Sequence, residues 1–218
     1  MNINSVYNKL KLVKEYGRAD LIDEILKELE IEIITNGKVD KSIISAYKRL
    51  VRMTADRPKF SKIYNSNGNY CLCDGYKLID YGKNINNIPK ELQVYISENT
   101  EEMNGLNFDN IKNNTTTIAE TLDIKELEKV KKYNKVNKKL ITYRIGNKHF
   151  DVNLILDLAI LSGLKETKIT IENDFEEISP INIIFNDEIK GLVLPIKKED
   201  WSENDKILDE ILKIGEEK

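Results

Sequence analysis

The sequence contains few of the residues that build metal and catalytic sites. It has one histidine and two cysteines among 218 residues, so it offers no histidine pair, and a zinc site is not expected. It also has no glycine-rich phosphate loop, no serine nucleophile elbow and no paired-histidine zinc motif. These absences predict a protein that is not an enzyme and that needs no cofactor and no metal.

Long apolar runs are missing as well. No window of about eighteen uncharged apolar residues is present, so we expect no membrane span. Charges are scattered through residues 1–17, which lack the apolar core of a secretory signal. We therefore expect a cytoplasmic protein without a membrane partner. In that reducing compartment, Cys71 and Cys73 are predicted to pack as free thiols on one side of a strand rather than to form a disulfide.

Charged residues are abundant and unevenly distributed. They make up 33% of the chain, against 40% hydrophobic residues, which is typical of a globular protein. Residues 41–62 hold seven basic side chains against Asp56, a net charge of +6, and residues 123–149 hold nine against three acids, again +6. Because the total is −3, the rest of the chain carries −15. A basic face on an acidic body is typical of a protein that contacts a polyanion; the alternative is that these lysines are merely solvated.

Apolar residues recur at helical spacing in several segments. The predicted helices cover residues 5–16, 19–29, 41–53, 123–133 and 154–161, with a last amphipathic helix beginning near residue 201. Asp40 is positioned to cap the third helix. We predict three parts: an N-terminal helical arm (1–38), an α+β domain (39–198, or two abridged halves 39–118 and 119–198) and an acidic C-terminal helix (199–218).

Extended patterns separate these helices. The predicted strands cover residues 60–64, 69–73, 76–80, 139–145, 148–152, 166–172, 181–185 and 191–196. Asp74 and Gly75 predict a tight turn, in which the aspartate forms the turn and the glycine supplies a positive φ. Strands and helices do not alternate regularly, so we predict an α+β fold with a largely antiparallel sheet and packed helices.

Several segments, in this order, resemble the building block of the bacterial DNA polymerase sliding clamp, the DNA polymerase III beta subunit. They are RPKFSKIY (57–64), CLCDGYKL (71–78), FDVNLILDL (150–158), KITI (168–171), SPINI (179–183) and LVLPIK (192–197). The resemblance implies a sliding-clamp (DNA clamp)-like fold. A clamp subunit has three such domains and this chain has room for one, or for two abridged ones, which is consistent with a short, phage-like divergent member that takes part in DNA replication.

The resemblance implies contacts to duplex DNA and to other proteins. Clamps turn helices toward DNA, and two predicted helices carry the basic residues that would make non-specific phosphate contacts. These DNA-binding candidates are Lys48, Arg49, Arg52, Lys125, Lys129 and Lys132. An apolar groove for short peptides of replication or host proteins would be bordered by Leu156, Leu192, Leu194, Pro195 and Ile196. Ordinary core packing is the alternative for the apolar set.

Three functional hypotheses follow. The first is a clamp-like DNA-associated processivity or recruitment factor whose edge strands support a homo-oligomer. The second is a phage-type protein-binding module that keeps the clamp-like fold and modulates a host replication or defence protein without binding DNA. The third is a nuclease with a magnesium site in the acidic segment 172–177, where a solvated turn is the simpler interpretation.

Overall fold

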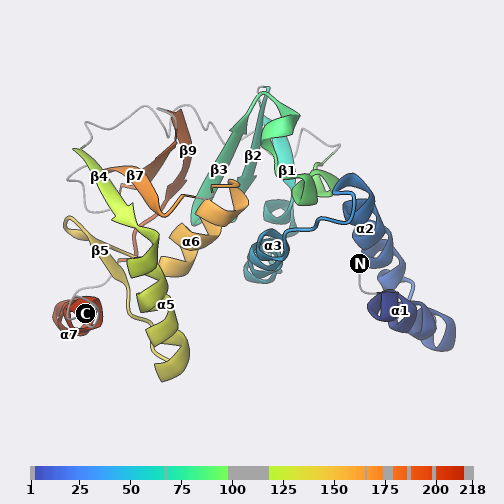
Figure 1. Ribbon diagram of the computed structural model, residues 1–218, viewed down its shortest axis with the longest axis horizontal. Coiled ribbons are helices and arrows are strands. Elements are labelled where there is room, and N and C mark those ends of the chain that lie inside the picture. The colour runs from blue at the N-terminus through green and yellow to red at the C-terminus, as the bar shows by residue number, and fades with distance from the viewer. Residues whose placement is uncertain are drawn as a thin grey trace.

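The computed structural model describes residues 3–66, 68–97, 118–164, 166–173, 179–185, 188–197 and 200–213. In these residues the chain forms an α+β fold, as predicted, with helices against one large antiparallel sheet (Figure 1). Of the acidic segment 172–177, residues 174–177 lie outside the described residues.

Seven strands of the described chain form the main sheet, in the order β1-β2-β3-β9-β8-β7-β4. Their bounds are β1 Ile63–Ser66, β2 Asn69–Cys73, β3 Lys77–Gly82, β4 Ile118–Asp123, β7 Lys168–Asn173, β8 Ile181–Phe185 and β9 Glu188–Val193. Every pairing is antiparallel. A separate hairpin consists of β5 (Tyr143–Ile145) and β6 (Lys148–Phe150). The pairing of β3 with β9 joins the early strands to the late ones.

Three helices cover one face of this sheet (Figure 1). They are α3 (Lys41–Met53), α5 (Ile124–Asn137) and α6 (Val152–Leu161). The central helix α6 is apolar on nearly every side, as expected for a buried helix, and it packs against β3 and β9 and between α3 and α5. The main hydrophobic core lies between this helical layer and the sheet.

The opposite face of the sheet carries a smaller apolar cluster. It contains Tyr64, Cys71, Leu78 and Leu192, with Cys73 at its edge. Cys71 and Cys73 are thiols that do not form a disulfide with each other, and they lie on the same side of β2, as predicted. Burial raises the pKa of the Cys73 thiol, which disfavours the reactive thiolate.

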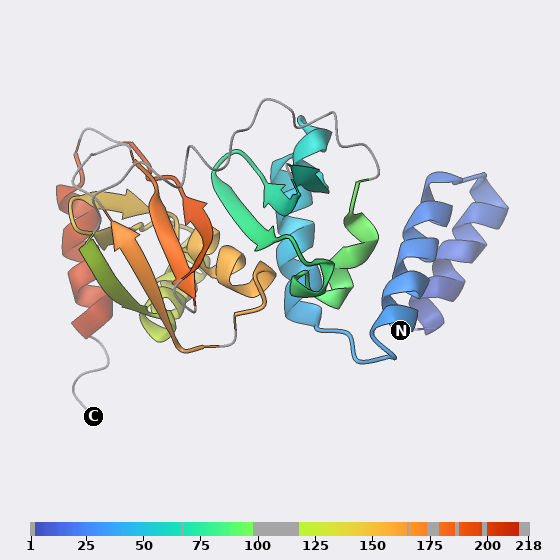
Figure 2. The same ribbon diagram turned by 90° about the horizontal axis from the view of Figure 1, so that it is seen from above.

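The N-terminal arm is a helical hairpin at one end of the molecule (Figure 2). It consists of α1 (Ile3–Tyr16) and α2 (Asp20–Ile34), and Lys9 joins them through ion pairs with Glu24 and Glu28 at 3.1 and 2.7 Å. The arm meets the domain where α2 packs against the 3-10 helix η3 (Lys90–Tyr95). A shorter 3-10 turn, η2 (Ile85–Asn87), precedes η3.

The C-terminal helix α7 (Ser202–Lys213) lies at the other end of the molecule. The sequence predicted this helix, and the structure adds that it packs along α5, with Leu208 and Ile211 in the main core. Asn204 binds the Thr142 backbone before β5, with its Oδ1 accepting from the amide at 2.8 Å. The acidic helix is therefore an integral part of the domain.

Local differences from the predicted strands have specific causes. Residues 58–61 form a 3-10 turn, η1 (Pro58–Ser61), in place of the start of a strand, because proline is favoured in the first turn of a helix. The strand predicted at 139–145 begins at Tyr143. Before it, the Asn134 side chain binds both the amide and the carbonyl of Ile141, which occupies the groups that a strand neighbour would use.

Candidate functional site

Helix α3 presents a basic outer face. The Asp40 carboxylate accepts a hydrogen bond from the Ser42 amide at 2.9 Å and so caps the helix, as predicted. The residues buried on its inner face are Ile43, Ala46, Tyr47 and Leu50. Lys48 and Arg52, four residues apart, lie away from that inner face and are exposed. Both are therefore accessible to a polyanion.

Helix α5 repeats this arrangement. Asp123 caps it by accepting from the Lys125 amide at 2.8 Å, and its inner face buries Leu127, Val130 and Asn134. The three predicted DNA-binding lysines are spaced i, i+4 and i+7, so they lie on one outer face of the helix. Lys125 and Lys132 are exposed and Lys129 is half-buried.

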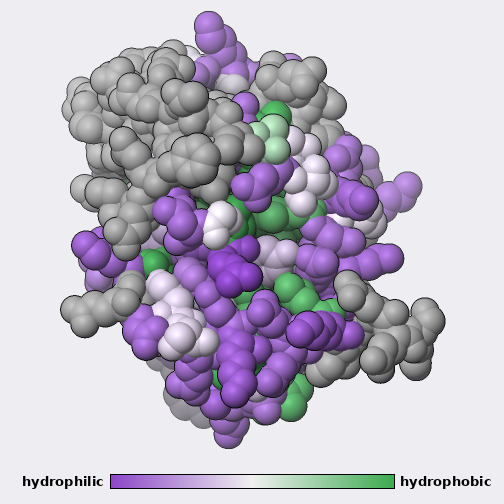
Figure 3. All heavy atoms as spheres, turned by 90° about the vertical axis from the view of Figure 1, so that its left-hand side faces the viewer, coloured by the Kyte–Doolittle hydropathy of each residue, from purple (hydrophilic) through white to green (hydrophobic). Residues whose placement is uncertain are grey.

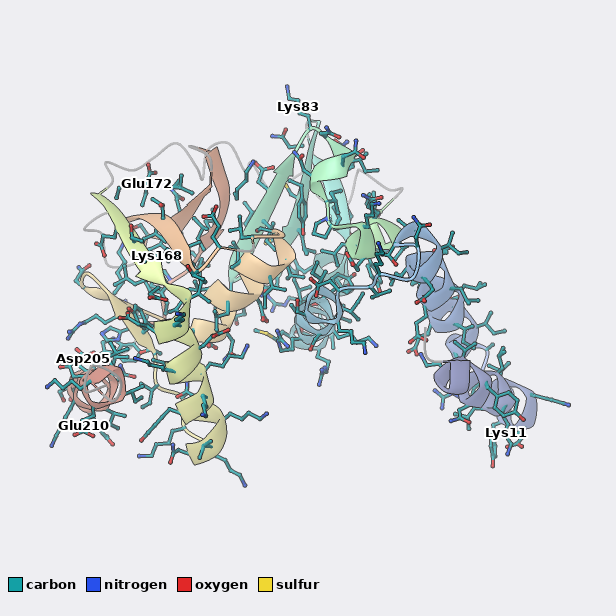
Figure 4. All side chains as sticks on the ribbon, in the orientation of Figure 1. Lys11, Lys83, Lys168, Glu172, Asp205 and Glu210 are labelled. Carbon is teal, nitrogen blue, oxygen red and sulfur yellow. The ribbon has the colours of Figure 1, made fainter. Side chains whose placement is uncertain are left out.

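The two basic faces belong to the same layer of the molecule. Both α3 and α5 pack against α6, which lies between them on the helical face of the sheet (Figures 1 and 4). Lys48 and Arg52 thus lie on the helix at one side of α6, and Lys125, Lys129 and Lys132 lie on the helix at the other. Five cations spread over two helices suit contacts to regularly spaced phosphates.

Arg49 does not belong with these cations, which corrects its assignment as a DNA contact. Its guanidinium binds the Asp157 carboxylate of α6, with Nε 3.1 and 3.2 Å from the two oxygens and Nη2 closer still. The Asp157 side chain is 3% exposed, so the arginine is its neutralising partner, and this hydrogen bond raises the pKa of Arg49. Arg49 holds α3 against α6.

Loss of this pair is expected to affect stability rather than DNA affinity. Arg49→Ala leaves the Asp157 carboxylate buried without its cation, and we expect the free energy of unfolding to fall by about 3 kcal/mol. Arg52→Ala, one turn further on and exposed, is the control and is expected to cost less than about 0.5 kcal/mol. Urea unfolding of both variants checks this. Equal stability of the two would show that the pair contributes little.

A groove separates α3 from the arm. It has a volume of about 790 Å³ and lies between α2, α3 and η3. The α2 wall is acidic on balance, with Glu24, Glu28 and Glu32 against Lys27. The α3 wall is basic, with Lys41, Lys48 and Arg52, and the apolar side chains of the groove include Ile44, Tyr47, Val51 and Tyr95. Lys48 and Arg52 thus border a groove whose other wall carries carboxylates that repel phosphates, so a nucleic acid can reach them only from the solvent side of α3.

The predicted peptide groove is not formed, which corrects that prediction. Leu156 and Leu192 are 4% and 6% exposed, and they belong to the separate apolar clusters on the two faces of the sheet. Leu194, Pro195 and Ile196 are half-buried, and the amides of Leu194 and Ile196 bind the carbonyls of Tyr76 and His149. The alternative, core packing, explains Leu156 and Leu192.

The predicted turn at Asp74 and Gly75 is present. Gly75 has φ +90°, and Asp74 Oδ1 accepts hydrogen bonds from the amides of Tyr76 and Lys77 at 2.9 and 2.8 Å. The structure adds an ion pair that the sequence did not reveal, because the second oxygen of Asp74 binds the ammonium of Lys77. Both side chains are at most 1% exposed.

His149 lies in a second polar network that sequence reasoning missed. It is 4% exposed, stacks on Trp201 at 4.2 Å, and has Nδ1 3.1 Å from Thr142 Oγ1. Its Nε2 lies 3.5 Å from an Asp205 oxygen. The Thr142 hydroxyl donates to Asn204 and is itself buried, so it has neither the free proton nor the exposure of a nucleophile. The network fastens α7 to the β5–β6 hairpin.

The described residues contain no group of three or more histidine, cysteine, aspartate or glutamate side chains arranged to hold a metal ion. No helix in the described part of the chain has the length and apolar content to cross a bilayer. Hydrophilic side chains predominate over the described surface at the end formed by α5 and α7 (Figure 3).

Comparison with known proteins gives no match of this chain to a protein-family model, a curated protein or a solved structure. The structure establishes an α+β fold with a large antiparallel sheet. The sliding-clamp resemblance stays a hypothesis that rests on the sequence segments given above.

Proposed function

We propose that this protein is a non-enzymatic, sliding-clamp-like factor that contacts the phosphates of duplex DNA without sequence specificity and serves processivity or recruitment. The observation that supports this best is the placement of basic outer faces on α3 and α5 at either side of α6. Arg49 is excluded from the contact set, because it pairs with Asp157. Five contacts remain: Lys48, Arg52, Lys125, Lys129 and Lys132.

Charge reversal tests this proposal. We expect Lys48→Glu/Arg52→Glu and Lys125→Glu/Lys132→Glu each to weaken binding to a fluorescent duplex at low salt by at least about ten-fold, as measured by anisotropy. The slope of log K against log salt is expected to flatten by about 1.8 in each variant, because about 0.9 counterion is released per phosphate contact.

The matched control reverses two exposed lysines elsewhere. Lys83→Glu/Lys206→Glu changes the net charge equally at exposed positions outside α3 and α5: Lys83, which Figure 4 marks, follows β3, and Lys206 lies on α7. We expect it to weaken binding less than about two-fold. Equal loss in control and test variants would mean that net charge alone governs binding, and a wild-type protein without salt-sensitive DNA affinity would refute the proposal.

A second candidate, a protein-binding module, is supported by the groove between α2 and α3. A groove with apolar side chains and with an acidic and a basic wall is complementary to an amphipathic helix that carries both charges. This candidate predicts no salt-sensitive DNA affinity in the wild-type protein, so the same anisotropy measurement separates the two.

A further inference from the structure

The arm carries an unusual share of the exposed apolar surface. Seven of the thirteen large apolar side chains that are exposed among the described residues lie on α1 and α2. On α2, Ile22, Leu26 and Ile33 are 42%, 51% and 73% exposed, and their separations of four and seven residues place them on one stripe. On α1, Tyr7 and Leu10 are 65% and 50% exposed, three residues apart.

This stripe has the spacing of a helix–helix seam. Together with the half-buried Leu29, it follows an alternating four–three–four spacing that is characteristic of helices packing side by side. Helices of 14 and 15 residues are marginal by themselves and depend on an apolar face being covered. Two packed helices cover each other on one side, and a four-helix bundle covers the stripe as well.

The charges on the two helices identify the partner. Helix α1 carries Lys9, Lys11 and Lys14 against Glu15, a net charge of +2. Helix α2 carries six acids against Lys27, a net charge of −5. A twofold axis brings the same surface of two copies together, so that α1 of each copy faces α2 of the other and unlike charges meet twice. The hairpin is therefore complementary to itself.

We propose that two copies of this chain associate through their arms, with α1 of one packed on α2 of the other in an antiparallel four-helix bundle. The arms lie at the end of the molecule opposite α7, so the pairing is remote from the lysines of α5 (Figure 2). This association is independent of the proposed DNA contact and is expected without DNA. A hairpin face of this size is at the low end of interface areas, so we expect a dissociation constant in the micromolar range.

Sedimentation equilibrium without DNA tests the pairing. The wild-type chain is expected to shift from monomer to dimer between about 1 and 200 μM, the range that spans a micromolar dissociation constant. Leu26→Glu, a charge in the exposed stripe, is expected to remain monomeric throughout. Val136→Glu is the matched control on α5, where the side chain is 71% exposed, and it is expected to dimerise like the wild type. Far-ultraviolet circular dichroism checks that both variants stay folded.

Charge exchange tests the orientation. Lys11→Glu/Lys14→Glu makes α1 acidic, and Asp23→Lys/Glu30→Lys makes α2 less acidic by four charges; all four side chains are exposed. Lys11→Glu/Lys14→Glu is expected to dimerise at least about ten-fold more weakly than the wild type, because its α1, now with a net charge of −2, faces the acidic α2 of the other copy. Asp23→Lys/Glu30→Lys is also expected to dimerise more weakly, because its α2, now with a net charge of −1, attracts the basic α1 less. An equimolar mixture is expected to dimerise better than either variant alone, because one helix pair in the mixed dimer keeps the native charges of +2 and −5, and the other brings the introduced glutamates to the introduced lysines.

The outcomes separate cleanly. The proposal is overturned if the wild-type chain stays monomeric at the highest concentration. It is also overturned if Leu26→Glu dimerises like the wild type, or if Val136→Glu loses dimerisation to the same extent as Leu26→Glu. A mixture that dimerises no better than either variant alone overturns the pairing of α1 with α2. Because every measurement is made without DNA, none of these results depends on the DNA-binding proposal.

Discussion

Replacement of Lys77 by methionine is expected to lower the free energy of unfolding by about 3 to 5 kcal/mol, the usual cost of breaking a buried ion pair from one side. Lys77 is 1% exposed and Asp74 is fully buried, and they bind each other beside the turn between β2 and β3. Methionine keeps most of the side-chain volume, so the loss arises from the carboxylate left without its cation. Urea unfolding with a fixed m-value measures it.

The double variant Asp74→Asn/Lys77→Met is the control for this pair. Asparagine keeps an oxygen that can accept the hydrogen bonds from the Tyr76 and Lys77 amides, and no charge remains buried. We expect it to recover at least about half of the lost stability, because exchanging both members of a buried pair costs less than removing one. A double variant no more stable than Lys77→Met would show that lost packing, and not an unpaired charge, causes the effect.

Local sequence signals predicted most of the elements. The cap at Asp40 starts α3, and the turn at Asp74 and Gly75 joins β2 to β3, as expected. Each of these features is a contact between residues two or three positions apart, so the pattern contains both partners. The strand β4 was not predicted, because its evidence lies in pairing with β7, about fifty residues further along the chain.

Side-chain roles were harder to predict where the partner is distant in sequence. Arg49 had the pattern of a solvated basic residue, and its partner Asp157 lies 108 residues away. Lys77 was missed because β3 is buried on both faces, so its apolar and polar residues do not alternate as in a half-exposed strand. Leu192 packs in the small apolar cluster on one face of the sheet, and Leu156 packs in the main core on the other. To predict that these two leucines lie on opposite faces, one must know the order of the strands in the sheet.

Replacement of Gly191 by alanine is expected to cost about 3 kcal/mol or more, at the upper end of the range for overpacked cores. Gly191 lies on β9, opposite Ile79 of β3 and Ile183 of β8. A Cβ at this position would lie 2.4 Å from the Leu78 carbonyl oxygen and 2.9 Å from the Leu158 Cδ1 atom of α6. The first contact is with backbone, which cannot move without separating β3 from β9. Thermal and urea unfolding measure the loss, and Thr170→Ala, on the exposed side of β7, is the control.

The double variant Gly191→Ala/Leu158→Ala identifies which contact sets the requirement for glycine. Truncation of Leu158 removes the clash with α6 but leaves the Leu78 oxygen in place, and it also opens a cavity in the core. We therefore expect the double variant to be less stable than either single variant. If Leu158→Ala instead restores the stability of Gly191→Ala, the constraint is the approach of α6 to the sheet. That outcome would make Gly191 the residue that sets the depth of α6, and through the Arg49–Asp157 pair the position of the basic face on α3.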